Sequence, residues 1–326
     1  MQTIHLTADN LPDLPQIALT IGNYDGVHLG HQAMITTLVD VAKSHQLRSA
    51  VMIFEPQPRE FLSPQNAPAR LTALHEKQAL LAGFGLDYLL VVHFDEAFRK
   101  LSAQAFCDLL KRLNAKHLVL GDDFRFGHDR AGDASFLRQA DFLVQSLPTV
   151  SNHDSRISST AIRQTLQAGD LAQAGELLGR DYAMMGEVVH GDKIGRTLDF
   201  PTANIALNRL QPSVQGVFAA DVLAFCDGKP LDWRQLAKDG KTGIAGVTQG
   251  SLLGAVNVGK RPSVNGVDWR AEVHLPEFAG DLYGLTLQVV FLHYLHGERR
   301  YDGLDALKQG IRQDVADILA WRADQG

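Results

Sequence analysis

The sequence predicts an α/β protein of two domains, a parallel sheet wound with helices and then an antiparallel β-barrel that ends in a helix. Residues 17–150 alternate short, almost wholly apolar runs with stretches of helical periodicity, and such runs suit a parallel sheet buried on both faces. After residue 182 the pattern changes to β-rich runs separated by Gly, Pro and Asp, which is typical of an antiparallel barrel. A length of 326 residues also favours two domains over one. We therefore expect the domains to cover residues 1–182 and 183–326.

The elements of the first domain alternate along the chain. Apolar runs predict strands at residues 17–21, 49–54, 88–93 and 117–121. Apolar positions at helical spacing predict helices at residues 32–47, 76–84, 102–113 and 158–178, the last with a break at Gly169. Because ligands of such sheets bind at the carboxyl ends of the strands, the loops that follow the strands are the candidate sites.

The second domain is predicted from a series of β-rich runs and one closing helix. The runs cover residues 184–190, 216–225, 253–258, 270–275 and 286–295. Residues 304–321 carry a single apolar stripe, which predicts a helix packed on the barrel. Residues 227–250 are polar and glycine-rich, and we expect them to form a long surface loop between strands.

Composition narrows the class of protein. It is 45% hydrophobic and 21% charged, as in an ordinary globular protein, and its net charge of −6 gives no support to binding of nucleic acid or a membrane surface. Cys107 and Cys226 form no disulfide framework and indicate a reducing compartment. The N-terminus lacks the pattern of a signal peptide, and no apolar run approaches the roughly 20 residues of a membrane helix. We expect a cytoplasmic protein, and the sequence does not indicate an oligomer.

Residues 20–31, Thr-Ile-Gly-Asn-Tyr-Asp-Gly-Val-His-Leu-Gly-His, join the first strand to the first helix. Glycines allow the backbone to approach a ligand, and a helix start offers free N–H groups to an anion. His28 and His31 can donate hydrogen bonds to phosphate oxygens. The loop therefore predicts a site for the phosphates of a nucleotide. Two histidines three residues apart are also compatible with a zinc site or with no ligand, but no third zinc ligand stands at a typical spacing.

A second motif, Ile-Ser-Ser-Thr-Ala-Ile-Arg at residues 157–163, opens the last helical stretch of the first domain. Ser and Thr in this position are ordinary N-caps. Arg163, one turn further on, adds a guanidinium to the hydroxyl groups and the free N–H groups. The motif predicts a second phosphate-binding element, and the two elements together could hold a triphosphate.

In the second domain, residues 191–204 combine a glycine-rich segment with Phe-Pro-Thr-Ala-Asn. The segment lacks the spacing and ending of a Walker A loop, so it is either a phosphate loop or a simple glycine turn. Thr202 and Asn204 face the same way on an extended segment and offer the hard oxygen ligands that Mg²⁺ prefers. Glu272 lies on an alternating strand, where it is either a solvated residue or a general base beside a metal–phosphate site.

These motifs resemble those of a known family. His28-Leu-Gly-His31 and residues 157–163 look like the nucleotidyltransferase superfamily. The ordered set along nearly the whole chain is similar to the bacterial bifunctional riboflavin kinase/FMN adenylyltransferases, also called prokaryotic FAD synthetases. The matching segments are residues 22–31, 54–61, 70–72, 121–127 and 157–163 in the first domain, and 200–204, 258–262, 272–275, 280–284 and the closing helix in the second.

The resemblance implies two activities and a Rossmann-like first domain. The first domain would adenylylate FMN to FAD and release pyrophosphate, and the second would phosphorylate riboflavin to FMN, with ATP as co-substrate and Mg²⁺ as cofactor in both. It further implies catalytic roles for His28, His31 and Glu272, the last as the base on the 5′-hydroxyl of riboflavin. The implied ATP and phosphate contacts are Gly22, Asp25, Gly30, Ser159, Thr160, Arg163 and Gly195; the flavin contacts are Phe61, Asp123 and Phe126; the Mg²⁺ ligands are Thr202 and Asn204. Phe61 and Phe126 are equally compatible with ordinary core packing.

Four residues depart from the family's usual pattern. They are Asp123 in place of Asn, Asp199 in place of Gly, Ser263 in place of Thr and His296 in place of Arg. Two other functions remain as alternatives, another adenylyltransferase of the superfamily and a flavin-binding regulator without catalysis. The second domain disfavours the first alternative, and the complete set of phosphate-binding residues disfavours the second.

Overall fold

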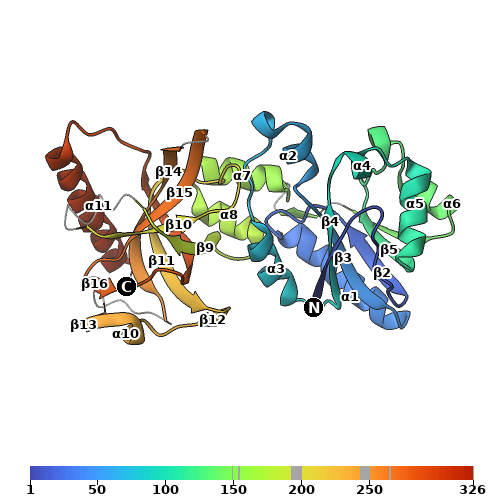
Figure 1. Ribbon diagram of the computed structural model, residues 1–326, viewed down its shortest axis with the longest axis horizontal. Coiled ribbons are helices and arrows are strands. Elements are labelled where there is room, and N and C mark those ends of the chain that lie inside the picture. The colour runs from blue at the N-terminus through green and yellow to red at the C-terminus, as the bar shows by residue number, and fades with distance from the viewer. Residues whose placement is uncertain (149, 153–154, 192–199, 243–249, 264–265, 326) are drawn as a thin grey trace. The chain divides into compact units, whose positions relative to one another are not determined.

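The computed structural model describes residues 1–148, 150–152, 155–191, 200–242, 250–263 and 266–325 (Figure 1). The chain separates into two compact units. The first comprises Met1–Pro68 with Leu74–Ala161, and the second comprises Ala69–Ala73 with Ile162–Gly326. Among the described helices, none is both long and apolar enough to cross a bilayer.

The first unit contains a six-stranded, fully parallel sheet in the order β1-β4-β3-β2-β5-β6. Its strands are β1 (Gln2–Leu6), β2 (Ile17–Ile21), β3 (Arg48–Glu55), β4 (Tyr88–His93), β5 (Ala115–Gly121) and β6 (Leu143–Leu147). The four central strands are those that the apolar runs predict. The edge strands β1 and β6 escaped prediction because polar residues interrupt both. A small hairpin of β7 (Ser151–Asn152) and β8 (Ser155–Arg156) follows.

Helices cover both faces of this sheet, so its strands are buried from two sides (Figure 1). Alternate residues of β3 belong to different core clusters: Met52 is in the cluster that contains Phe106 of α5, and Ile53 is in the cluster that contains Leu38 of α1. This confirms the predicted parallel sheet with two buried faces. The helices are α1 (Leu29–Ser44), α2 (Pro58–Leu62), α3 (Leu74–Ala82), α4 (Glu96–Arg99), α5 (Ala103–Arg112) and α6 (Ala134–Gln139), with short 3₁₀ helices at Pro64–Asn66 and His128–Arg130.

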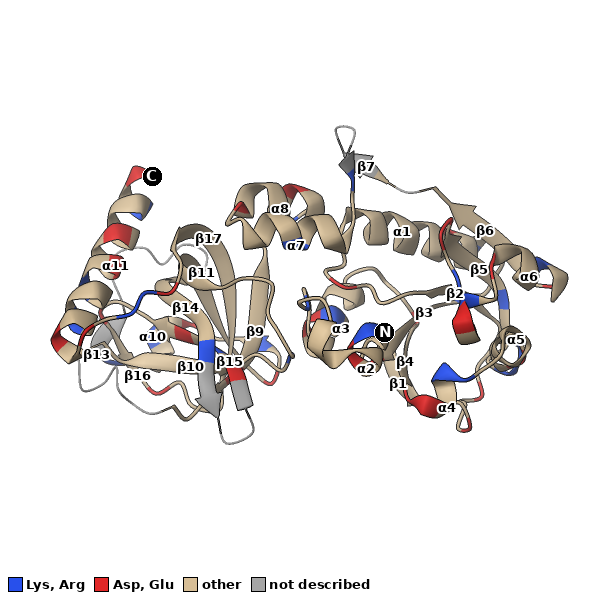
Figure 2. Ribbon diagram, turned by 90° about the horizontal axis from the view of Figure 1, so that it is seen from above, with Lys and Arg blue, Asp and Glu red and all other residues tan. Residues whose placement is uncertain are grey.

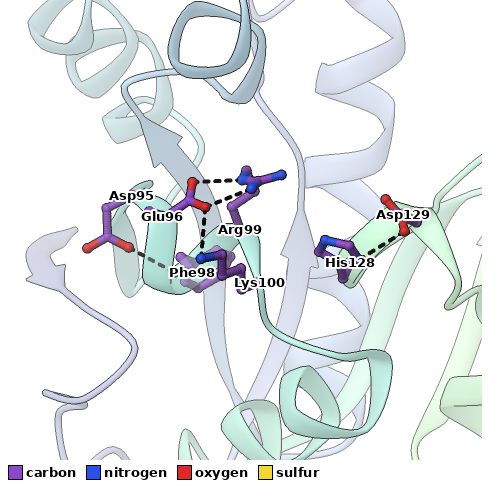
Figure 3. Close-up of polar contacts among 7 residues, drawn as sticks. All are labelled: Asp95, Glu96, Phe98, Arg99, Lys100, His128 and Asp129. Carbon is purple, nitrogen blue, oxygen red and sulfur yellow. Dashed lines mark hydrogen bonds and ion pairs between the residues drawn. The ribbon is translucent and has the colours of Figure 1, made fainter.

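An exposed cluster of charges surrounds α4 (Figure 3). Asp95 caps the helix by accepting from the Phe98 N–H at 2.8 Å, and Glu96 pairs with Arg99 at 2.7 Å and Lys100 at 3.2 Å. Hydrogen bonds from Arg99 and then Lys100 lower the pKa of Glu96 to about 2. Since these partners come from one helical turn and are solvated, the cluster is ordinary surface electrostatics and not a candidate site.

The second unit contains a closed antiparallel barrel. The strands run in the order β12-β11-β14-β15-β10-β9-β17, and pairing of β11 with β17 closes the ring. They are β9 (Ala183–Val189), β10 (Thr202–Ala206), β11 (Gly216–Cys226), β12 (Lys229–Pro230), β14 (Leu252–Ser263), β15 (Gly266–His274) and β17 (Thr286–His296). The predicted barrel is therefore present. A two-stranded sheet of β13 (Ala237–Thr242) and β16 (Phe278–Gly280) stands beside it.

Two predictions for this part of the chain, a broken helix at 158–178 and a surface loop at 227–250, have different outcomes. Residues 158–178 form two helices, α7 (Ser159–Gln167) and α8 (Leu171–Leu178), and Gly169 breaks them with φ +78°, as predicted. The segment 227–250, expected as a long surface loop between strands, does lie between β11 and β14, but its described part has secondary structure of its own. It contains β12, α10 (Trp233–Leu236) and β13, and the buried Trp233 packs edge-on against Phe278. One large apolar side chain anchors an otherwise polar segment.

The C-terminal helix α11 (Leu304–Asp324) carries both acidic and basic residues along its length (Figure 2). Three contacts hold it to the barrel strands: His296 with Asp314 at 2.7 Å, Arg322 with Asp221 at 3.3 Å, and the stacked rings of His293 and Trp321. Asp314 is buried, and the second ring nitrogen of His296 contacts the Gly297 carbonyl at 2.7 Å. His296, a departure from the family's pattern, thus connects a barrel strand to α11.

We predict that Asp314→Ala destabilises the second unit by about 2 kcal/mol, because it removes the buried carboxylate that pairs with a ring nitrogen of the partly buried His296. Urea unfolding followed by circular dichroism measures the change. The control is Asp317→Ala, which removes an exposed carboxylate from the same helix. Equal losses from the two substitutions would contradict a specific role for the buried contact.

Candidate active sites

The loop between β2 and α1 has an unusual backbone. Tyr24, Gly26 and Val27 have φ values of 49°, 85° and 41°, and this left-handed region is unfavourable for all but glycine. Tyr24 is held there by its surroundings, because its ring is 1% exposed and its hydroxyl contacts Thr20 Oγ1 at 2.6 Å. Strain of this kind persists only where tertiary contacts impose it, and it is concentrated at functional sites.

The two histidines of the loop form a compact pair. α1 begins three residues earlier than predicted, so His28 is its N-cap and accepts from the His31 N–H through Nδ1 at 3.3 Å. The two rings stack with centroids 3.6 Å apart and planes 15° apart. Gly30 lies between them, and a Cβ there would come within 3.3 Å of the His28 ring. The glycine therefore leaves room for the stacked pair.

One ring nitrogen of His31 is available for a hydrogen bond. Its Nδ1 is buried and has no hydrogen-bond partner within the described ranges. Burial, followed by electrostatic interaction with His28 and with Lys77, holds the pKa of His31 well below its ordinary value. The ring is therefore neutral at physiological pH, and an incoming oxygen ligand can satisfy its free nitrogen.

The second predicted phosphate element meets the first through Ser159. Its Oγ donates to the Asp25 carbonyl at 2.8 Å, which brings together two motifs 134 residues apart. Ser158 accepts from the Ala161 N–H at 3.2 Å and so caps α7, whose first turn holds the exposed Thr160. Arg163, further along α7, belongs to the second unit, where its Nε donates to the Ala69 carbonyl.

The three predicted flavin contacts occupy different surroundings. Phe61 is half-buried and packs edge-on against Phe94. Phe126 is 6% exposed and contacts other rings of the core, including Phe106 at 5.0 Å, so its packing favours the core interpretation. Asp123 is exposed just beyond β5, and its carboxylate accepts from Arg156 at 2.7 Å.

Sequence reasoning missed two polar residues of the first unit. Lys77 on α3 is completely buried, and its ammonium donates to the Asn23 carbonyl at 2.6 Å. The sequence could have indicated this burial, because Lys77 and Leu81 are four residues apart and lie on the same face of a predicted helix. Gln57 is also buried, and its Nε2 has no hydrogen-bond partner among the residues described. Its motif was noted in the sequence, but burial of the amide cannot be read from it.

The second candidate site lies on the barrel ladder. Thr202 and Asn204 point the same way from β10, and Asn204 stands directly opposite Glu272 of β15. Asn204 is buried, and within the described part of the chain its Oδ1 has no hydrogen-bond partner. A Cβ on Gly191 would collide with the Asn204 amide at 2.4 Å, so only glycine leaves this amide in place.

Glu272 is flanked on both sides by amides. Asn257 of β14 is its partner on the strand opposite to Asn204, so that a row of Asn, Glu and Asn crosses three strands. His274, two residues further on, accepts or donates at Nδ1 to the Pro201 carbonyl at 2.9 Å. Burial lowers the pKa of His274, so the ring is neutral and Nδ1 is the donor.

Three predictions lie wholly or partly beyond this description. Gly195 and Asp199 fall outside the described residues, and the side chain of Ser263 is not among those described. Across the part of the chain that the structure covers, no three side chains of His, Cys, Asp or Glu gather as a metal site. The buried Asn204 oxygen and the Thr202 hydroxyl are hard donors that suit Mg²⁺, whose remaining ligands are commonly phosphates and water.

Comparison with known proteins was made along the whole chain. Residues 11–161 match the family model described as FAD synthetase, and residues 178–322 match that described as riboflavin kinase. The bifunctional riboflavin kinase/FMN adenylyltransferase of Escherichia coli K12 is 44% identical over 94% of this chain and 93% of that protein. The Pseudomonas fluorescens protein of the same name is 42% identical over 99% and 98%. A Streptococcus pneumoniae crystal structure described as a macrolide-efflux protein has a TM-score of 0.73 and 29% identity, covering 96% of this chain and 97% of that one.

We predict that stability falls as the pH drops through 6.5, in part because of His31. In the unfolded chain His31 takes up a proton near its ordinary pKa, whereas the folded state keeps it neutral. The stability that His31 contributes is fully present above that ordinary pKa and is lost progressively as the pH falls below it, by on the order of 1 kcal/mol at pH 5.5. Urea unfolding at pH 8.0 and 5.5 should show a smaller pH effect in His31→Gln than in the wild type. The control His5→Gln, at an exposed histidine, should keep the wild-type effect; the same pH effect in His31→Gln would contradict the prediction.

Proposed function

The chain belongs to the bifunctional riboflavin kinase/FMN adenylyltransferase family, and we propose which of its residues carry out each reaction. The protein phosphorylates riboflavin to FMN and adenylylates FMN to FAD, with ATP as co-substrate in both steps. We assign the adenylyltransferase domain to residues 1–182 and the kinase domain to residues 183–326. The start of β9 (Ala183–Val189), the first barrel strand, supports this division.

In the proposed adenylyl transfer, a phosphate oxygen of FMN attacks the α-phosphorus of ATP. The new P–O bond forms as the bond to pyrophosphate breaks, and pyrophosphate leaves. Such a transfer depends on positioning and on stabilisation of charge more than on a side-chain nucleophile. The observation that carries the assignment is the buried, unpartnered Nδ1 of His31 beside the N-terminus of α1, which is ready to contact a phosphate oxygen.

The rest of the adenylyl site is assigned around this atom. His28 would face the phosphates with His31, Gly22 and Gly30 would allow close approach of the backbone, and Asp25 is held by Ser159. Thr160, exposed in the first turn of α7, would add a hydroxyl group to this grip. For the flavin we propose Phe61, whose ring is half-buried, and the exposed Asp123; Phe126 packs within the core.

In the proposed kinase reaction, the 5′-hydroxyl of riboflavin attacks the γ-phosphorus of ATP and ADP leaves. Glu272 accepts the proton of the hydroxyl, and Asn204 and Asn257 flank its carboxylate. Thr202 and Asn204 would hold Mg²⁺. When bound, Mg²⁺ neutralises charge on the phosphate oxygens. The unpartnered Asn204 Oδ1 is the observation that supports this site most directly.

We also propose a cytoplasmic location for the enzyme. Both cysteines are unpaired, with Cys107 buried and Cys226 exposed, which suits a reducing compartment. The negative net charge disfavours nucleic acid as a partner. The flavins and ATP account for the binding that the two reactions require.

We predict that His28→Ala lowers kcat/KM for conversion of FMN to FAD on the order of 100-fold or more, because it removes a phosphate-facing ring and the cap of α1. Chromatography of products from riboflavin and ATP should show FMN accumulating at the wild-type rate. The exposed His5→Ala serves as the control. Loss of both products from a folded His28→Ala protein would contradict separate sites.

We predict that Glu272→Gln lowers the rate of riboflavin phosphorylation on the order of 100-fold or more, since the amide cannot accept the hydroxyl proton. Supplied FMN should still be converted to FAD at the wild-type rate. The exposed Glu277→Gln, just beyond the same strand, is the matched control. Undiminished phosphorylation in Glu272→Gln would remove this residue from the role of base.

A further inference from the structure

Lys77 is a charged residue whose side chain is completely buried close to the proposed adenylyl-transfer site. Its side chain is 0% exposed, although it lies on α3, whose other inward residues include the core residue Leu81. Taking an ammonium group out of water costs several kcal/mol unless polar partners compensate. An apolar residue would be the ordinary occupant of this position, so the charge calls for a physical reason.

One contact of the ammonium is with the strained loop. Lys77 Nζ donates to the Asn23 carbonyl at 2.6 Å, between Gly22 and the left-handed Tyr24. A charged donor makes a stronger hydrogen bond than a neutral one. The contact ties α3 to a loop 54 residues earlier in the chain, and it fixes a backbone group of the phosphate-binding corner.

The charge of Lys77 also reaches the histidine pair. It is one of the three causes that lower the pKa of His31, after burial and the effect of His28. In a buried site a fixed charge acts more strongly than in water. The positive charge that disfavours protonation of His31 would attract a negatively charged triphosphate. Lys77 therefore favours the neutral form of His31 and would attract the anionic substrate.

We propose that Lys77 is a positioning residue for adenylyl transfer, which anchors the Gly22–Val27 loop through Asn23 and supplies a fixed positive charge beside His31 for the triphosphate of ATP. The inference rests on the proposed function of this corner. It assigns to α3 a part in the reaction that neither phosphate motif contains.

The test compares three substitutions that separate the anchor from the charge. Lys77→Met removes both, Lys77→Gln keeps a donor but loses the charge, and Lys77→Arg keeps both. The matched control is Lys43→Met, at an exposed lysine of α1 in the same unit. Each protein is assayed for FAD formation from FMN over a range of pH, with kcat and KM for ATP measured separately. Riboflavin phosphorylation by the same samples monitors the second domain, and near-ultraviolet circular dichroism monitors the fold.

We expect Lys77→Met to lower kcat/KM for ATP on the order of 100-fold. In both Lys77→Met and Lys77→Gln the acid limb of the pH profile should move to higher pH, because His31 loses a neighbouring charge. Lys77→Arg should keep the wild-type limb, and Lys43→Met should match the wild type. A purely structural role would lower stability without moving the limb.

Two results would overturn the inference. One is FAD synthesis in Lys77→Met within about threefold of the wild type, well short of the loss expected from misplacement, with an unmoved acid limb. The other is an unmoved limb in a folded Lys77→Gln protein, which keeps the inference falsifiable if Lys77→Met does not fold. His28→Ala in the same assay separates the two failures. If it retains FAD synthesis, the proposed site is wrong, whereas its inactivity beside an unaffected Lys77→Met overturns the role of Lys77 alone.

Discussion

The adenylyl-transfer corner depends on how the chain passes from β2 into α1. Within residues 22–27, Tyr24, Gly26 and Val27 adopt a left-handed backbone conformation, and only Gly26 does so without a steric cost. The conformation is imposed by contacts from three directions: the hydroxyl of Tyr24 on Thr20, the ammonium of Lys77 on Asn23, and the hydroxyl of Ser159 on Asp25. These contacts come from a strand, a helix and a second motif. Contacts from separate parts of one unit therefore fix the position of the loop. The loop in turn holds the stacked histidines in place for the proposed ligand.

The kinase site reaches preorganisation by a different physical route. Its groups stand on neighbouring barrel strands, where the ladder fixes their spacing without help from helix ends. The row of Asn204, Glu272 and Asn257 places an unpaired acceptor and a carboxylate side by side, and Gly191 keeps the space beside Asn204 open. Two transfers from ATP thus use two kinds of scaffold in one chain. In the site proposed for the first transfer, helix N-termini and imidazoles would face the phosphates; in the site proposed for the second, strand-borne oxygens would suit a cation.

Sequence patterns predicted the elements of this architecture in which burial determines the types of residue. The four central strands were found because both faces are buried, and the break at Gly169 was found because helical spacing stops there. Edge strand β1 was missed because its exposed residues need not be apolar. Lys77 was missed for a related reason: helical periodicity is judged from apolar residues, so a lysine interrupts the apolar pattern even where its side chain is buried. The motif at residues 157–163 was recognised, but the partner of Ser159 is a backbone carbonyl, which no residue type can indicate.

The departure at His296 illustrates how a motif difference can leave a physical role intact. Both of its ring nitrogens face oxygen acceptors, one on Gly297 and one on the buried carboxylate of Asp314. An arginine, usual here in the family, is also a donor suited to a carboxylate. His296 therefore keeps a donor between the end of β17 and α11, on a shorter and flatter side chain. Because α11 also contacts Asp221 through Arg322 and His293 through Trp321, His296 provides one of several attachments of this helix. The position is thus better understood as part of the packing of the C-terminal helix than as a lost contact of the kinase site.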